Sequence, residues 1–115
     1  MRSVLITPPA GPPFSASLAD TFLPRFLGLM GKNLVQRDAL LLSPCNQIHC
    51  FFMKSAIDAV YLAPSGEILA LTASMAPGTV GKAVKGAARV LELYPGDAQR
   101  LGLAPGQILA IGGTL

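Results

Sequence analysis

The chain has 115 residues, which matches the usual size of one domain and leaves little room for a second hydrophobic core. Hydrophobic residues make up 51% of the chain and charged residues only 13%, a composition that excludes a disordered protein. Nine basic and six acidic residues give a net charge of +3, which is too low for the dense basic surface of a nucleic-acid-binding protein.

Residues 1–13 predict a short strand followed by a proline-rich loop. The letters SVLIT at 3–7 are typical of a strand, and PPAGPP at 8–13 cannot donate hydrogen bonds to a sheet. The apolar stretch before the prolines is shorter than the core of a secretion signal, and no run is long enough to span a membrane. We therefore expect a soluble, cytoplasmic protein.

The next segment predicts a strand and then a helix. Apolar residues alternate with small polar ones over 14–18, which is the pattern of a strand. Over 22–30 the apolar residues fall at helical spacing, with Thr21 as a candidate N-cap and Gly31 placed to end the helix.

The middle of the chain predicts further strands. ALLLS at 39–43 and the β-branched and aromatic stretch over 48–62 are typical of strands. PSG at 64–66 predicts a hairpin turn, after which EILALTASM at 67–75 would return as the antiparallel partner. Residues 76–86 hold three glycines and a proline without a clear period, and predict a long surface loop.

The C-terminal part predicts two more strands with a helical turn between them. AARVLELYPG at 87–96 is typical of a strand ended by a turn, and QILAIGG at 107–113 is typical of a closing strand. Between them, DAQRLGL predicts a single helical turn capped by Asp97.

Together these elements predict a β-rich α+β fold. We expect a compact, mainly antiparallel barrel or sandwich of about six to eight short strands with one short helix. The whole chain, 1–115, is predicted to be a single domain, with the N-terminal strand and loop at 1–13 and the core at 14–111.

Three segments carry a family resemblance. They are ADTFLPRFLGLMGK at 19–32, FFMKSAIDAVYL at 51–62 and VLELYPGDAQRLGLAPGQIL at 90–109. In this order they resemble motifs of the bacterial and archaeal family called domain of unknown function 192. The resemblance implies a compact β-rich domain and no assigned activity. Gln107 stands where that family usually has an acidic residue, so the resemblance implies no role for a carboxylate there.

The stretch CNQIHCFFMK at 45–54 gathers both cysteines and the only histidine. On one extended strand Cys45 and Cys50 would lie roughly 16 Å apart, whereas a disulfide needs Cα atoms within about 7 Å. Cys45 and His49 would share one face of the strand and Cys50 the other, so the three cannot meet at one metal ion. We expect no disulfide, no metal and no cofactor.

Charged residues inside apolar strands are the more informative pattern. Asp58 shares the alternation face of Val60 and Leu62, and Glu92 shares that of Val90 and Tyr94, so both carboxylates should be shielded from water. One interpretation is that Arg25 or Lys54 forms an ion pair with one of them and holds the predicted helix on the sheet. The other is that these residues converge on a binding pocket with His49.

The leading hypothesis is a non-enzymatic binding or accessory domain that takes a small ligand or a protein partner. Its candidate site is Arg25, His49, Met53, Lys54, Asp58 and Glu92. One alternative is a small hydrolase with Asp58 or Glu92 as general base and His49 assisting. Another is a structural module whose loop at 76–86 contacts a protein. The cluster Lys82, Lys85 and Arg89 predicts a solvated loop rather than nucleic-acid binding.

Overall fold

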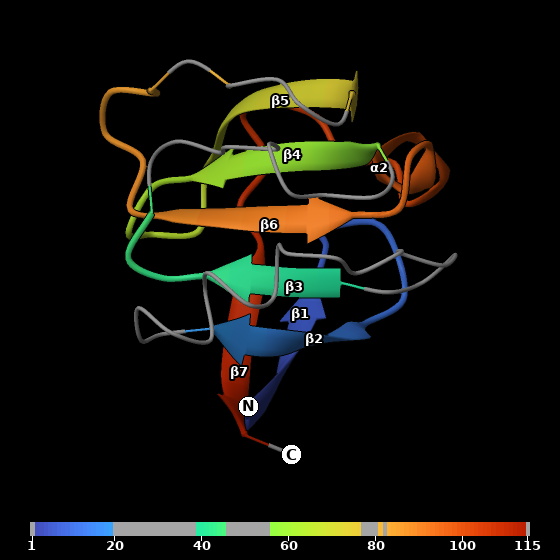
Figure 1. Cartoon of the computed structure of the whole chain (residues 1–115). Helices are drawn as coiled ribbons and strands as arrows, with labels where there is room; N and C mark the ends of the chain where they lie inside the picture. Colours follow the sequence, from blue (N-terminus) through green and yellow to red (C-terminus); the bar gives the residue numbers. More distant parts are fainter. Residues whose placement is uncertain (1, 20–38, 46–55, 77–80, 82, 115) are drawn as a thin grey trace.

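The computed structural model of the chain describes residues 2–19, 39–45, 56–76, 81 and 83–114 (Figure 1). The helix predicted over 22–30 and the stretch at 46–55 lie outside these ranges. The described elements are β1 (Arg2–Thr7), β2 (Phe14–Ala19), β3 (Ala39–Leu42), β4 (Ile57–Leu62), β5 (Ile68–Met75), β6 (Arg89–Leu93), α2 (Asp97–Arg100) and β7 (Ala110–Thr114).

The strands form one curled, mixed sheet in the order β5-β4-β6-β3-β2-β1-β7. All neighbours pair antiparallel except β2 and β3, which run parallel with Ser17 opposite Leu40. This half-barrel with one short described helix confirms the predicted fold class. The strands predicted over 3–7, 14–18, 39–43 and 67–75 are confirmed as well.

The curl brings the two ends of the sheet together through backbone hydrogen bonds. The Ile68 N–H donates to the Gln107 carbonyl at 2.8 Å, and the Leu109 N–H donates to the Gly66 carbonyl at 3.0 Å. Figure 1 shows the C-terminal segment, in red, running behind the other strands to reach this point. Because 107–109 makes these contacts with residues 66–68, the regular strand β7 begins at Ala110, later than the predicted start at 107.

The turn at 64–66 is the predicted hairpin turn between β4 and β5. The Gly66 N–H donates to the Ala63 carbonyl, and the Ala63 N–H donates to the Glu67 carbonyl, both at 2.9 Å. Gly66 has φ +92°, and a Cβ atom added there would lie 2.3 Å from the Leu109 carbonyl oxygen. Only glycine fits both the backbone conformation and this close approach.

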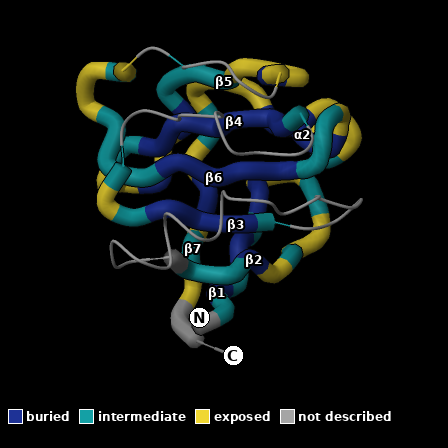
Figure 2. The backbone as a smooth tube through the Cα atoms, in the orientation of Figure 1, coloured by how far each residue is buried: buried dark blue, intermediate teal, exposed yellow. Residues whose placement is uncertain are grey.

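Both faces of the central strands are buried (Figure 2). All six residues of β4 are buried, which explains why its sequence is nearly continuously apolar rather than alternating. The inner face, inside the curl, carries a core cluster that draws on β1 to β6, α2 and the C-terminal segment. The outer face carries a second cluster, formed by Leu40, Leu42, Ile57, Ala59, Tyr61, Met75 and Val90.

Candidate functional site

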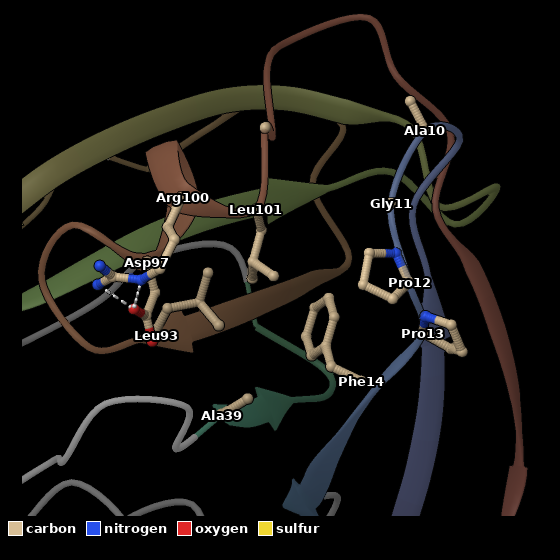
Figure 3. Close-up of a pocket in the computed structure, with 11 residues that line it drawn as sticks. Ala10, Gly11, Pro12, Pro13, Phe14, Ala39, Leu93, Asp97, Arg100 and Leu101 are labelled. Atoms are coloured by element: carbon tan, nitrogen blue, oxygen red, sulfur yellow. Dashed lines mark hydrogen bonds and ion pairs between the residues drawn. The ribbon is translucent and has the colours of Figure 1, made fainter.

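A pocket of about 630 Å³ opens between the proline-rich loop and α2 (Figure 3). Its described lining combines the loop and the start of β2 with the start of β3, the end of β6 and the helical turn. The lining residues are Ala10, Gly11, Pro12, Pro13, Phe14, Ala39, Leu93, Asp97, Arg100, Leu101 and Gly102.

The pocket is mainly apolar because of where its strands begin and end. Phe14 is the first residue of β2, and Ala39, the first of β3, lies opposite Leu93, the last of β6. Phe14, Ala39 and Leu101 are partly buried and pack against the inner core. Pro12 and Pro13 fix the backbone torsion of the loop before Phe14, which gives this wall a stiff backbone.

One ion pair supplies the charge in the pocket. The Asp97 Oδ1 accepts hydrogen bonds from Arg100 Nε at 3.0 Å and from Arg100 Nη2 at 2.5 Å. The side chain of Asp97 is only 4% exposed, whereas that of Arg100 is 50% exposed. The exposed member of the pair is therefore Arg100, while the Asp97 carboxylate is buried.

The helical turn that carries this pair is held by Asp58 from β4. Asp58 is 1% exposed, and its Oδ2 accepts the N–H groups of Gly96 at 3.0 Å and Ala98 at 3.1 Å. Its Oδ1 accepts the N–H of Ser74 at 2.8 Å, near the end of β5. Asp58 thus joins the end of β5 to the wall of the pocket, and every bond it makes here is charge-assisted.

The cap predicted at Asp97 is wrong. Gly96 occupies the N-cap position with φ 91°, a left-handed conformation that favours glycine, and glycine has no side chain to accept a hydrogen bond. Asp58 supplies the missing acceptor from another strand. Asp97 is instead the first residue of the helix and pairs with Arg100 one turn on.

Glu92 lies on the other face of the sheet. It is 0% exposed, as the sequence predicts, and it sits opposite Leu40 and Ala59, both members of the outer cluster. Asp58 contacts α2 on the inner face. The two carboxylates therefore point to opposite sides and do not converge on one pocket.

Of the six predicted site residues, the described part of the chain contains Asp58 and Glu92. Arg25, His49, Met53 and Lys54 lie outside it, so their convergence on a pocket stays a prediction. The sequence reasoning missed Phe14, Asp97 and Arg100 as pocket residues. An acid and a base three residues apart in DAQR was an available signal for the ion pair, because such residues are neighbours on a helix.

The described residues show no metal-binding group. Across these ranges, no three His, Cys, Asp or Glu side chains come close enough together to hold a metal ion. None of the described helical segments has the length and hydropathy that crossing a bilayer requires.

Comparisons with known proteins agree on the fold. The sequence profile of a family named DUF192 and described as "Uncharacterized ACR" matches residues 5–111. A crystal structure from Sinorhizobium meliloti 1021, described as a "putative transcription regulator", aligns with a TM-score of 0.79 at 22% identity and covers 96% of this chain and 92% of that chain.

A protein of unknown function from Novosphingobium aromaticivorans DSM 12444 aligns with a TM-score of 0.78 at 21% identity, over 94% of this chain and 83% of that chain. At such identities the likeness shows the fold alone. No curated protein is significantly similar to the chain.

Proposed function

The chain belongs to the DUF192 family, which is described as uncharacterised. We propose that the protein is a non-catalytic binding domain. Its ligand is a small molecule that enters the pocket between the proline-rich loop and α2. The single observation that carries this proposal is a mainly apolar pocket with one charged pair in its wall.

The size and lining of the pocket support this function. Ligand sites are typically concave, on the order of 300–1,000 Å³, and lined by apolar side chains with a few polar groups that fix orientation. The pocket of about 630 Å³ has Phe14 and Leu101 as its apolar contacts and Arg100 as its exposed polar group.

The described carboxylates favour binding over acid–base catalysis. Asp58 and Glu92 face opposite sides of the sheet, so these two carboxylates do not form an acid–base pair with each other. The hydrolase alternative, which combines one of them with His49, stays a prediction because His49 lies outside the described residues. The oxygens of Asp58 already accept three backbone N–H groups. A polar pocket around FFMK at 51–54, with Arg25, His49, Met53 and Lys54, remains our second proposed location for ligand contacts.

The name of the Sinorhizobium protein raises nucleic-acid binding as another function. Two of the described basic residues favour the small ligand instead. Arg89 donates to the Pro64 carbonyl and Arg100 to Asp97, so both guanidinium groups take part in contacts within the fold. A continuous basic surface, which nucleic-acid binding needs, is not supported by a net charge of +3.

A titration with a set of small aromatic and aliphatic metabolites, followed by amide chemical shifts in NMR, tests the proposal. We expect shifts confined to the amides of residues 10, 11, 14 and 97–102, and their loss in a Phe14→Ala variant, because the ring supplies much of the apolar wall. The matched control is Lys85→Ala, an exposed residue outside the pocket lining.

Two results would contradict this placement. If no compound shifts these amides, the pocket is not a ligand site. If binding survives in Phe14→Ala but is lost in a His49→Ala, Lys54→Ala double variant, the ligand binds at the FFMK stretch instead.

A further inference from the structure

We infer that the ligand of this pocket is uncharged and predominantly apolar, with an aromatic or branched hydrocarbon body and no ionised group. This inference deepens the proposed function and rests on it. It follows from which polar groups of the pocket wall already have partners within the fold, and from the apolar surface that is left for a ligand to contact.

The two charges in the described pocket wall neutralise each other. Arg100 donates to Asp97 Oδ1 through both Nε and Nη2. Figure 3 shows the guanidinium directed toward Asp97 and away from the Phe14 ring. Both members of the pair also take part in further interactions within the chain. The described lining contains one acid and one base, so it presents no net charge to a ligand.

The backbone donors on the helical side of the pocket are used within the fold as well. Four N–H groups of this wall each donate to a carbonyl of residues 94–99 at 2.8–3.0 Å, and they belong to Asp97, Arg100, Leu101 and Gly102. On the opposite wall, Pro12 and Pro13 have no N–H to offer. A phosphate or a sugar needs several such donors, and the described wall has few to give.

An ionised ligand would therefore lose more by leaving water than it gains in the pocket. Burying a charge is costly unless the charge is both paired and hydrogen-bonded. The Asp97 carboxylate is 4% exposed and already accepts from Arg100, so it is poorly placed to receive a ligand amine. Arg100 in turn is engaged by Asp97, so a ligand carboxylate would have to compete with a buried one.

The apolar side chains of the lining select the ligand body. Phe14, Leu93 and Leu101 point toward one another in the pocket (Figure 3). Leu93 belongs to the inner core, and Phe14 and Leu101 pack against it. An aromatic ring or a branched alkyl group covers such a surface and removes it from water, which is the main favourable contribution available here.

The test uses three probes that share a benzyl group and differ only in what it carries: a methyl group in ethylbenzene, a carboxylate in phenylacetate and an ammonium group in benzylammonium. Affinities are measured at neutral pH from the amide chemical shifts of residues 10, 11, 14 and 97–102. We expect ethylbenzene to bind the wild-type chain at least tenfold more tightly than either ion, the order of magnitude set by burying an unpaired charge.

An Asp97→Asn variant tests whether the ion pair is the reason for this preference. The substitution removes the negative partner of Arg100, so the guanidinium becomes available to a ligand carboxylate. The affinity for phenylacetate relative to that for ethylbenzene should rise about fivefold, the strength of a half-exposed ion pair. The matched control is Lys85→Gln, at an exposed position outside the pocket lining, which should leave this ratio unchanged.

Two outcomes separate the inferred ligand class from the proposed function. If phenylacetate or benzylammonium shifts the pocket amides of the wild-type chain with an affinity equal to that of ethylbenzene, the uncharged ligand is wrong and the binding function stands. If all three probes leave these amides unshifted and the metabolite titration is negative, the proposed function itself fails. The wild-type ranking decides the ligand class even if Asp97→Asn does not fold.

Discussion

Two cross-links tie distant parts of the curled sheet together, and they use different chemistry. In the backbone cross-link, residues 66–68 bond to residues 106–109 through main-chain groups alone. In the carboxylate cross-link, the buried side chain of Asp58 joins β5 to α2 through three N–H groups. The first depends on side chains only where the backbones approach most closely, at Gly66, while the second depends on one specific carboxylate.

The fold is therefore sensitive to different kinds of substitution at the two cross-links. Backbone bonds can form with almost any side chain, so the backbone cross-link should fail through steric obstruction. The carboxylate cross-link should fail through lost hydrogen bonds, because buried N–H groups without an acceptor are costly. The two kinds of failure can be separated by substitutions at single positions.

The largest effect is expected from Gly66→Ala. The new Cβ would lie 2.3 Å from the Leu109 carbonyl oxygen, and the residue would also keep an unfavourable positive φ. We expect a loss of about 3–5 kcal/mol in the free energy of unfolding, or failure to fold, measured by urea denaturation.

Gly106→Ala is the matched control for this prediction. Gly106 belongs to the same cross-link and has φ +94°, but no atom lies within 4 Å of an added Cβ. Backbone strain alone should cost about 1–2 kcal/mol there. Equal losses in the two variants would show that the close approach at Gly66 does not matter.

A smaller loss is expected from Asp58→Asn, which keeps the shape of the side chain but replaces one acceptor oxygen with an amide donor. The free energy of unfolding should fall by about 2–4 kcal/mol in urea denaturation. Hydrogen exchange should accelerate at the amides of Ser74, Gly96 and Ala98, which donate to the carboxylate.

Exchange that accelerates at all backbone amides by the same factor would show that Asp58 supports the whole fold rather than this link. Unchanged stability would show that the three bonds are replaced by water or by other acceptors.

The smallest effect is expected from Asp97→Asn. Its partner Arg100 is half exposed, and pairs of this kind contribute about 1 kcal/mol or less because water and salt screen them. The comparison with Asp58→Asn sets the Asp97 carboxylate, within α2, against the Asp58 carboxylate of β4, which accepts N–H groups at the start of α2. A loss in Asp97→Asn as large as in Asp58→Asn would mean that the ion pair, and not the cap from β4, holds α2.

The strands were predictable because their signals are local. Alternation over 14–18, the apolar run before PSG and the turn glycine at 66 each act within a few residues of the chain. The two-residue period of a strand also predicted that Asp58 and Glu92 are buried, because each shares a face with apolar residues of its own strand. These features need no knowledge of which strands meet.

The pocket and the carboxylate cross-link were not predictable in this way. The acceptor of the Ala98 N–H lies forty residues earlier in the chain, and a local capping rule assigned the role to Asp97 instead. The pocket forms only because the parallel pair β2 and β3 brings Phe14 and Ala39 near the end of β6. Such juxtapositions come from tertiary pairing rather than from any one segment.

Through its three hydrogen bonds Asp58 acts as a staple, that is, a cross-link between distant parts of the chain of the kind that disulfides and structural metal ions provide. Small domains have limited cores and often need such a staple, and a disulfide typically contributes about 2–4 kcal/mol. Three charge-assisted bonds to a buried carboxylate reach a similar magnitude. Unlike a disulfide or a zinc site, this staple cannot be opened by a reductant or a chelator, so it holds α2 in place under any redox condition or metal supply.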